Sequence, residues 1–197
     1  MKGLVYHGNK DLRLETLPEP SPSRDEVKLR VDFCGICATD IEEYLYGPNF
    51  ISAAPNPLTG RSVPLTTGHE IAGTVVELGE GVQDIEVGQR AVFNGILTCG
   101  ECLWCDVNQT QQCRYMTAVG FGTDGGLTEY LVWPVSHIVP LPENVTSREA
   151  ALTEPASVAS HAVKRAGVSP GDRVLILGVG TVGMLATILE FARRHRV

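Results

Sequence analysis

The chain has 197 residues, enough for one large domain or a domain and a half with a sizeable buried core. Apolar residues make up 43% and charged residues 20% of the sequence, which is too apolar for intrinsic disorder. Lys and Arg number 16 against 23 Asp and Glu, which gives a net charge of −7. This balance excludes a protein that holds nucleic acid or an anionic membrane by electrostatic attraction.

No stretch of the sequence is suited to crossing a membrane. The two longest charge-free stretches, 44–60 and 174–189, fall short of the ~20 residues that a span needs and contain prolines or glycines. The first twenty residues hold no apolar run of the kind found in secretory signals. From the sequence we therefore expect a cytoplasmic protein.

The first 145 residues are predicted to be mostly β. Residues 27–33 alternate apolar and polar side chains, the period of a half-buried strand, and 70–78 form a second candidate that ends in a glycine turn. Residues 84–93 and 126–135 give further short candidates. Most of the 12 prolines lie in this part, which favours a partly open, barrel-like domain with long loops.

The pattern changes near Thr146. Thr146 and Glu149 are spaced as a capping box, so we expect a helix to begin there, to run toward Ala166 and to be interrupted at Pro155. A turn at 169–172 precedes the apolar run Arg173–Leu177, which is typical of a strand buried on both faces. A glycine-rich turn and a helix over 184–194 follow.

Four cysteines of the chain form a compact cluster, Cys99, Cys102, Cys105 and Cys113. Closely spaced thiolates on one polar segment can surround a zinc ion tetrahedrally, and four protein ligands leave no open position. Three disulfides from the six cysteines are disfavoured in a reducing compartment. An iron–sulfur cluster is disfavoured because its usual run is tighter and ends in Cys-Pro, whereas Arg114 follows Cys113. We expect a structural zinc site.

A second possible metal site draws on separate segments. Cys37 follows Cys34 in a CxxC pattern, His69 and Glu70 come about thirty residues later, and Glu154 comes later still. A thiolate, an imidazole and a carboxylate suit a catalytic zinc whose fourth position is left to water or substrate. The spacing alone is equally compatible with a buried Cys37 and a structural His69. The other histidines fit no ligand spacing: His7, His137, His161 and His195.

Several motifs together resemble one known family. They are the segments 34–40 (CGICATD), 43–48 (EYLYGP), 57–60 (PLTG), 68–70 (GHE), the four-cysteine lobe at about 95–115, Glu154-Pro155 and the later GxGxxG turn. In this order they resemble the zinc-dependent medium-chain dehydrogenase/reductase family, and within it the butanediol and sorbitol (polyol) dehydrogenases. The resemblance extends over essentially the whole chain.

The resemblance implies roles for individual residues. The catalytic zinc ligands would be Cys37, His69 and Glu154, with Glu70 behind the metal or an occasional ligand. Asp40 would orient His69, and Thr39 would take the proton from the alcohol. Cys34 would be a buried neighbour.

One position departs from the family pattern. Many members have a histidine five residues after the catalytic cysteine, where it ends a proton relay, and this chain has Glu42. Glu42 could accept that proton, or the relay could exit through water while Glu42 is simply solvated.

The glycine turn follows a predicted buried strand and opens a helix, which is the context that a dinucleotide-binding turn requires. Its glycines allow a pyrophosphate to approach the helix N-terminus. The alternative is a purely structural turn. The candidate cofactor-binding residues are Gly178, Gly180, Thr181, Val182 and Gly183.

The resemblance implies two domains. Residues 1–145 would form a GroES-like alcohol dehydrogenase catalytic domain, and residues 146–197 an incomplete Rossmann domain truncated at the C-terminus. The function implied is the zinc-dependent interconversion of a secondary alcohol, a 2,3-butanediol-like diol or a polyol, with its ketone by hydride transfer to NAD(H), with NADP not excluded. Complete members are expected to form homo-oligomers. A non-catalytic zinc-binding module remains the alternative.

Overall fold

The protein is described by a computed structural model that covers residues 1–169 and 171–194. Pro170 of the predicted turn and His195 lie outside the described residues. Packing divides the chain into a first unit, Met1–Ala151, and a second unit, Leu152–Val197. The division falls six residues after the boundary predicted from the sequence, because the short helix that begins at Ser147 packs with the first unit.

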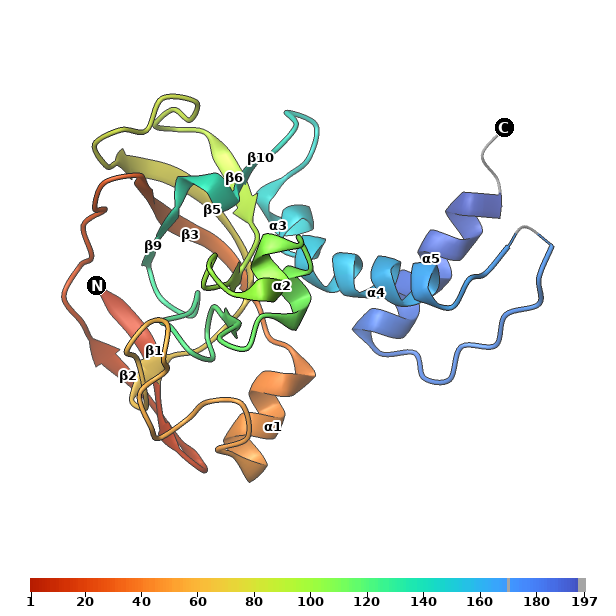
Figure 1. Ribbon diagram of the computed structural model, residues 1–197, viewed down its shortest axis with the longest axis horizontal. Coiled ribbons are helices and arrows are strands. Elements are labelled where there is room, and N and C mark those ends of the chain that lie inside the picture. Colours follow the sequence, from red (N-terminus) through yellow and green to blue (C-terminus); the bar gives the residue numbers. More distant parts are fainter. Residues whose placement is uncertain (170, 195–197) are drawn as a thin grey trace. The chain divides into compact units, whose positions relative to one another are not determined.

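Three antiparallel sheets build the first unit (Figure 1). The largest has the order β10-β6-β5-β3-β9, with bounds Ile138–Pro140, Arg90–Phe93, Glu70–Leu78, Glu26–Gly35 and Tyr130–Pro134. A second sheet has the order β2-β1-β4, with bounds Asp11–Thr16, Lys2–Gly8 and Leu65–Thr66. The third pairs β7 (Ile96–Leu97) with β8 (Thr117–Ala118). None of the sheets described closes into a barrel, which agrees with the open architecture expected.

The large sheet forms because its strands bury apolar side chains in one cluster. Val27 and Leu29 of β3 and Val75 of β5 are fully buried, and Trp133 of β9 packs on the same cluster. The predicted strands at 27–33 and 70–78 are thereby confirmed as β3 and β5. The two weaker candidates contain only the shorter strands β6 and β9, since the rest of each segment is turn or loop.

Short helices lie between the strands. Helix α1 (Ala38–Tyr46) follows β3, α2 (Leu103–Asp106) and a 3₁₀ turn (Thr110–Gln112) belong to the cysteine lobe, a second 3₁₀ turn (Val135–His137) follows β9, and α3 (Ser147–Ala150) ends the unit. The predicted capping box is present at α3, where Thr146 and Glu149 hydrogen-bond each other's backbone amides.

The second unit contains two packed helices, α4 (Thr153–Arg165) and α5 (Thr181–Arg194). The helical run predicted from Thr146 breaks before Thr153 and not at Pro155, because Pro155 lies in the first turn of α4, where a missing amide costs nothing. The strand predicted at Arg173–Leu177 is wrong: these residues are irregular, and Leu175 and Leu177 are more than 80% exposed. No other strand occurs in the described part of this unit to accept its hydrogen bonds.

No helix in the parts of the chain that the structure covers is long and apolar enough to cross a bilayer.

A half-buried carboxylate ties α3 to the large sheet. Asp32 of β3 accepts hydrogen bonds from the hydroxyls of Thr74 (2.7 Å) and Ser147 (2.9 Å) and from the Arg30 guanidinium (3.0 Å). Burial alone would raise the pKa of Asp32, but these hydrogen bonds together hold it below its ordinary value.

Replacing Asp32 with Asn should destabilise the first unit in a pH-dependent way. Because the folded-state pKa lies below the unfolded one, the carboxylate stabilises the fold above the unfolded pKa of about 3.9, and this contribution disappears as pH falls through the folded pKa. Asp32→Asn should therefore cost roughly 1–2 kcal/mol at pH 7 and progressively less below pH ~4. Urea unfolding followed by tryptophan fluorescence measures this. The exposed Asp84, changed to Asn, is the control; equal losses at pH 7 and pH 3 would contradict the prediction.

Candidate functional site

The register between β3 and β5 brings three possible metal ligands together. In the antiparallel pair, Gly35 at the end of β3 lies opposite Glu70 at the start of β5. Cys37 comes two residues after Gly35, and His69 immediately precedes Glu70, so both lie at the same end of the ladder. One ligand atom from each of Cys37, His69 and Glu70 lies within 4.8 Å of the other two.

The start of α1 fixes the position of Cys37. Cys37 is the N-cap residue, and its backbone amide donates to Oδ2 of Asp40 at 2.8 Å. The other oxygen of Asp40, Oδ1, lies 3.6 Å from Nδ1 of His69. Both of these atoms are buried and without a hydrogen-bond partner. Asp40 therefore contacts both sides of the cluster, and it is placed as a partner that would orient His69.

Two glycines make room for this arrangement. A Cβ atom at Gly35 would collide with the carboxylate of Glu70. Gly68 has φ of +94°, which favours glycine, and a Cβ there would lie 2.7 Å from Sγ of Cys34. The backbone of 125–127 hydrogen-bonds to Thr66, Thr67 and Gly68, and so holds the turn before His69.

The electrostatics of the cluster favour added positive charge. Burial lowers the pKa of His69, but the neighbouring Asp40 and Cys37 outweigh burial and raise it to about 9. Burial raises the pKa of Glu70, and Asp40 adds to this while His69 opposes it. When no other cation is present, His69 and Glu70 therefore hold their protons more tightly than the free side chains do.

The residues fit a zinc ion. Thiolate sulfur, imidazole nitrogen and carboxylate oxygen are the donors that zinc takes in catalytic sites, and a histidine ligand commonly donates its other ring nitrogen to a carboxylate. Here that second nitrogen is Nδ1 of His69, unpartnered and facing Asp40. A divalent cation would also offset the negative charge of the acidic groups around His69.

The other predicted residues of this site are placed as follows. Oγ1 of Thr39 lies 3.6 Å from Sγ of Cys37, and Glu42 is exposed on α1 one turn further on. Cys34 is not part of the gathered set in the described residues; burial raises the pKa of its thiol to about 12. Glu154 lies in the first turn of α4, in the second unit. Its role as a ligand stays a prediction.

An aromatic wall lies beside His69, and the sequence had suggested only one of its members, Phe50, as a possible border of the substrate pocket, with packing as the alternative. The ring of Phe121 lies 4.8 Å from that of His69, and Phe50 packs on Phe121 at 5.8 Å in an edge-to-face arrangement. The three residues come from distant segments, so no spacing pattern connects them. Phe50 carries the only available signal, as an aromatic residue within the GPNF sequence after α1.

The four-cysteine lobe has the geometry of a tetrahedral metal site. The sulfur atoms of Cys102 and Cys105 are 3.6 Å apart, those of Cys113 and Cys99 3.5 Å, and those of Cys99 and Cys105 4.0 Å. A tetrahedron with Zn–S bonds near 2.3 Å has edges of about 3.8 Å. A disulfide would need about 2.05 Å, and all four cysteines are free.

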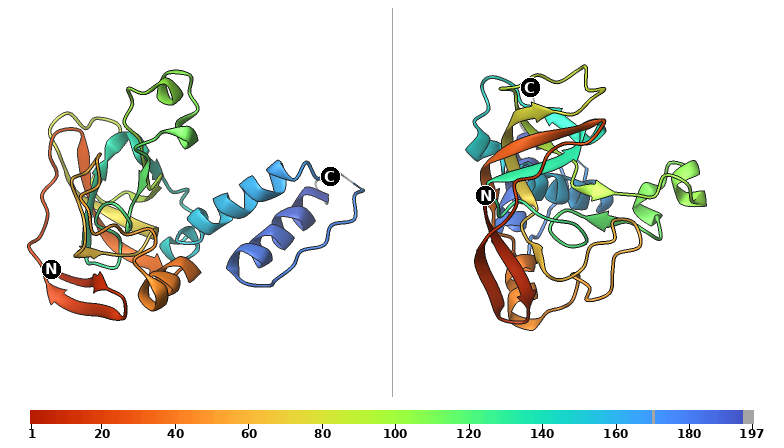
Figure 2. Two further views of the ribbon diagram at one scale, coloured as in Figure 1. Left: turned by 60° about the horizontal axis from the view of Figure 1, so that its bottom comes forward. Right: turned by 90° about the vertical axis from the view of Figure 1, so that its left-hand side faces the viewer.

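Backbone amides support the thiolates of the lobe. Amides of Cys105 and Trp104 at the start of α2 lower the pKa of Cys102 to about 6, and the backbone of Cys99 donates to Sγ of Cys113 at 3.4 Å. The lobe projects from the sheets in the right-hand view of Figure 2, and β7 and β8 pair at its base.

The glycine turn precedes α5 as predicted, although the strand before it is absent. Gly178 has φ of +100°, and a Cβ at Gly183 would collide with the carbonyl oxygen of Gly178. The tight turn therefore needs glycine at both positions, as the motif implies. Helix α5 begins directly after it at Thr181. The assignment of Gly178, Gly180, Thr181, Val182 and Gly183 to cofactor binding stays a prediction.

Residues 23–143 match the family profile of the alcohol dehydrogenase GroES-like domain. The match covers more than half of the chain and includes the β3–β5 ladder next to which Cys37 and His69 lie. The chain belongs to this family.

Particular relatives refine the comparison. The chain is 38% identical to the (R,R)-butanediol dehydrogenase of Bacillus subtilis over 94% of its length, and 33% identical to a sorbitol dehydrogenase of Halalkalibacterium halodurans over 99%. It resembles the crystal structure of the Bacillus subtilis butanediol dehydrogenase with a TM-score of 0.89 at 35% identity, over 97% of this chain and 55% of that one. It also resembles the crystal structure of a proposed zinc-binding dehydrogenase from Sinorhizobium meliloti bound to NADP. That match has a TM-score of 0.86 at 30% identity and covers 97% of this chain and 53% of that one. The chain spans about half the length of the curated relatives it matches.

The thiols of the metal-free protein should differ sharply in reactivity. Only the thiolate is alkylated, so at pH 8 Cys102, whose pKa is about 6, should be modified by iodoacetamide long before Cys34, whose pKa is about 12. Peptide mass spectrometry of a time course reads out each site.

The same time course with zinc added serves as the control, because bound metal should protect Cys102 and leave the slow reaction of Cys34 unchanged. Alkylation of Cys34 at a rate comparable to that of Cys102 would contradict the burial that the structure gives it.

Proposed function

We propose that the chain forms the metal-binding catalytic domain of a zinc-dependent dehydrogenase that interconverts a secondary alcohol and its ketone with a nicotinamide cofactor. A 2,3-butanediol-like diol or a polyol is the proposed substrate class. The proposal rests on one observation above all: Cys37, His69 and Glu70 come together at the end of the β3–β5 ladder with Asp40 behind them. The butanediol and sorbitol dehydrogenases among the relatives support the substrate class.

The chain's own residues divide the work at this site. Cys37 and His69 hold the metal, Asp40 fixes the ring of His69, and Glu70 or Glu154 provides the carboxylate ligand. A zinc ion bound here supplies the Lewis acidity that makes an alcohol oxygen acidic and a ketone electrophilic. Thr39, adjacent to Cys37, accepts the alcohol proton. Glu42 lies three residues further along the same helix, so the two side chains share a face, and Glu42 passes the proton to solvent.

The glycine turn provides the second half of the proposal. Gly178, Gly180 and Gly183 allow a cofactor pyrophosphate to approach the amides at the start of α5, including those of Thr181 and Val182. NAD(H) is the proposed cofactor, and NADP remains open, since one structural relative was crystallised with NADP. A cytoplasmic location and homo-oligomerisation of the complete enzyme stay predictions.

The purified chain should bind about two zinc ions, one at each ligand set. Cys37→Ser should remove one ion and leave the fold intact, because the β3–β5 ladder does not depend on the metal. Cys99→Ser should remove the other ion and cause aggregation, because the lobe has almost no apolar core of its own. Elemental analysis together with size-exclusion chromatography measures both effects.

Cys34→Ser is the matched control for Cys37→Ser, since it removes the other thiol of the same CxxC segment and should leave both zinc ions bound. A single zinc ion that is insensitive to Cys37→Ser would refute the catalytic site, and an absence of zinc would refute both sites.

Activity provides the direct test. The chain, or the same chain continued by whatever sequence follows it in its gene, should oxidise 2,3-butanediol or a polyol with NAD, and Thr39→Val should lower kcat by about 10²-fold or more through loss of the proton acceptor. A panel of diols and polyols with NAD and NADP identifies the substrate. Zinc binding without turnover in either form would favour a non-catalytic zinc-binding module.

A further inference from the structure

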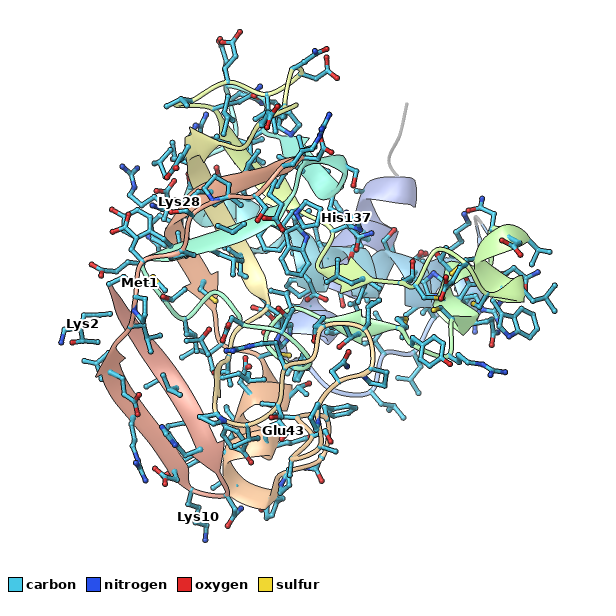
Figure 3. All side chains as sticks on the ribbon, turned by 60° about the vertical axis from the view of Figure 1, so that its left-hand side comes forward. Met1, Lys2, Lys10, Lys28, Glu43 and His137 are labelled. Atoms are coloured by element: carbon cyan, nitrogen blue, oxygen red, sulfur yellow. The ribbon has the colours of Figure 1, made fainter. Side chains whose placement is uncertain are left out.

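Strand β2 forms an open edge of the second sheet. The sheet has the order β2-β1-β4, so β2 pairs with β1 on one side and with no described strand on the other. With six residues it is the longest edge strand among the described sheets. Figure 3 shows the β1–β2 hairpin, with Lys2 labelled at its open end and Lys10 at its turn. An edge of this kind presents backbone groups with which another strand can pair.

The pairing of β2 with β1 determines which of its backbone groups point outward. The amino group of Met1 donates to the carbonyl oxygen of Leu17 at 2.9 Å, and the amide of Leu17 donates back to Met1 at 2.8 Å. Hydrogen-bonded and non-hydrogen-bonded pairs alternate along an antiparallel ladder, and the register is unbroken over residues 12–16. The N–H and C=O groups that point away from β1 therefore belong to Leu12, Leu14 and Thr16.

The side chains at this edge are complementary to a second copy of the same strand. Leu14, at the middle of the edge, is 72% exposed. Arg13 and Glu15 flank it with opposite charges, and their side chains are 57% and 35% exposed. When two copies of β2 are aligned antiparallel with Leu14 opposite Leu14, Arg13 of each copy lies opposite Glu15 of the other. Leucine then packs on leucine on one face of the sheet, and opposite charges meet on the other face.

This alignment uses the whole edge, and its neighbours do not. Centred on Leu14, it pairs Leu12 with Thr16 of the other copy, so that the outward groups form about six backbone hydrogen bonds. An alignment centred on Thr16 would place Leu14 opposite Pro18, which has no N–H to donate. An alignment centred on Leu12 would place Leu14 opposite Lys10, in the turn, where φ is +58° and the chain is not extended.

Charge excludes the two intermediate alignments. A symmetry axis beside Arg13 or beside Glu15 would make that residue face its own copy. Like charges directly opposite each other destabilise a strand pair, which is one way in which proteins protect sheet edges. In β2 the same charges attract when the axis passes at Leu14. The sequence of the strand therefore specifies one symmetric pairing.

We infer that β2 is a self-association surface, and that two copies of this chain pair antiparallel through it with Leu14 opposite Leu14. The pairing joins two three-stranded sheets into one continuous sheet around a twofold axis. It uses no residue of either candidate metal site, so it goes beyond the proposed function and does not depend on it. An interface built on one short strand belongs to the small, transient class, with a dissociation constant in the micromolar range.

A charge exchange tests the pairing. Arg13→Glu brings carboxylates opposite each other, and Glu15→Arg brings guanidinium groups opposite each other, so each variant alone should associate at least about tenfold more weakly than the parent chain. An equimolar mixture of the two variants should form a heterodimer, because every facing pair then has opposite charges. Sedimentation equilibrium gives Kd, and native mass spectrometry with one variant isotope-labelled separates heterodimer from homodimer.

Arg24→Glu is the matched control for the charge exchange. It makes the same change of charge at a side chain that is 73% exposed and lies after β2, so Kd should stay within about twofold of the parent value. Circular dichroism shows whether each variant is folded. Formation of the heterodimer also shows that both exchanged strands keep their extended conformation.

A second test removes a backbone donor and leaves the charges unchanged. The amide of Thr16 points away from β1, so Thr16→Pro removes no hydrogen bond within the chain and is tolerated at an edge. It should weaken association at least about tenfold, because the proline has no N–H and its ring occupies the place of the second strand. Thr16→Val is its matched control, since it keeps the amide and the branched side chain, and its Kd should stay within about twofold of the parent value.

Two results would overturn the inference. One is a parent chain that remains monomeric at concentrations near 1 mM, roughly the upper limit of a micromolar affinity. The other is association that is equally strong in the parent, Arg13→Glu and Thr16→Pro, which would place the contact on another surface. Zinc content measured on the same samples should be equal in all variants, so a failure of the metal sites is recognised separately from a failure of the pairing.

Discussion

The pairing of β3 with β5 is the constraint on which the candidate site depends. The site residues lie just beyond the last pair of this ladder, Gly35 opposite Glu70, so the register of the two strands sets the distance between Cys37 and His69. The register shifts twice along the ladder, near Leu29 and near Phe33, and the pairing of Gly35 with Glu70 follows from both shifts. A slip by one residue would turn Glu70 to the other face of the sheet and separate the ligand atoms. The buried cluster around Val27, Leu29 and Val75 holds the register, so the hydrophobic core and the metal chemistry are linked.

The two metal sites of this chain are built in different ways. The four-cysteine lobe takes all its ligands from one short segment, and local amides at the start of α2 stabilise the thiolate of Cys102. The site of Cys37 and His69 instead needs long-range pairing, a glycine with positive φ at Gly68 and a carboxylate from α1. An ion bound by the four cysteines should therefore fix the conformation of the lobe. An ion bound by Cys37 and His69 instead meets ligands whose positions the β3–β5 pairing has already set.

The sequence allowed much of this arrangement to be predicted, for identifiable reasons. Alternation over 27–33 and 70–78 is a strong signal, because one face of each strand is buried, and the cysteine cluster is local enough to be recognised from spacing. The packing of Phe50 on Phe121 beside His69 was not predictable, because it depends on contacts between residues far apart along the chain. The apolar run at 173–177 has the composition of a strand, but a strand forms only beside a partner, and the described part of the second unit offers none.

The ribbon formed by β7 and β8 has a consequence for how the cysteine lobe relates to the rest of the domain. Ile96 lies opposite Ala118 and Leu97 opposite Thr117, so the chain leaves and re-enters the domain at adjacent points. An excursion closed in this way is topologically a long hairpin tip. A change in the length of such an insertion, down to a tight two-residue connection, need not displace the β3–β5 ladder that positions Cys37 and His69. The cysteine lobe is in this sense a detachable module.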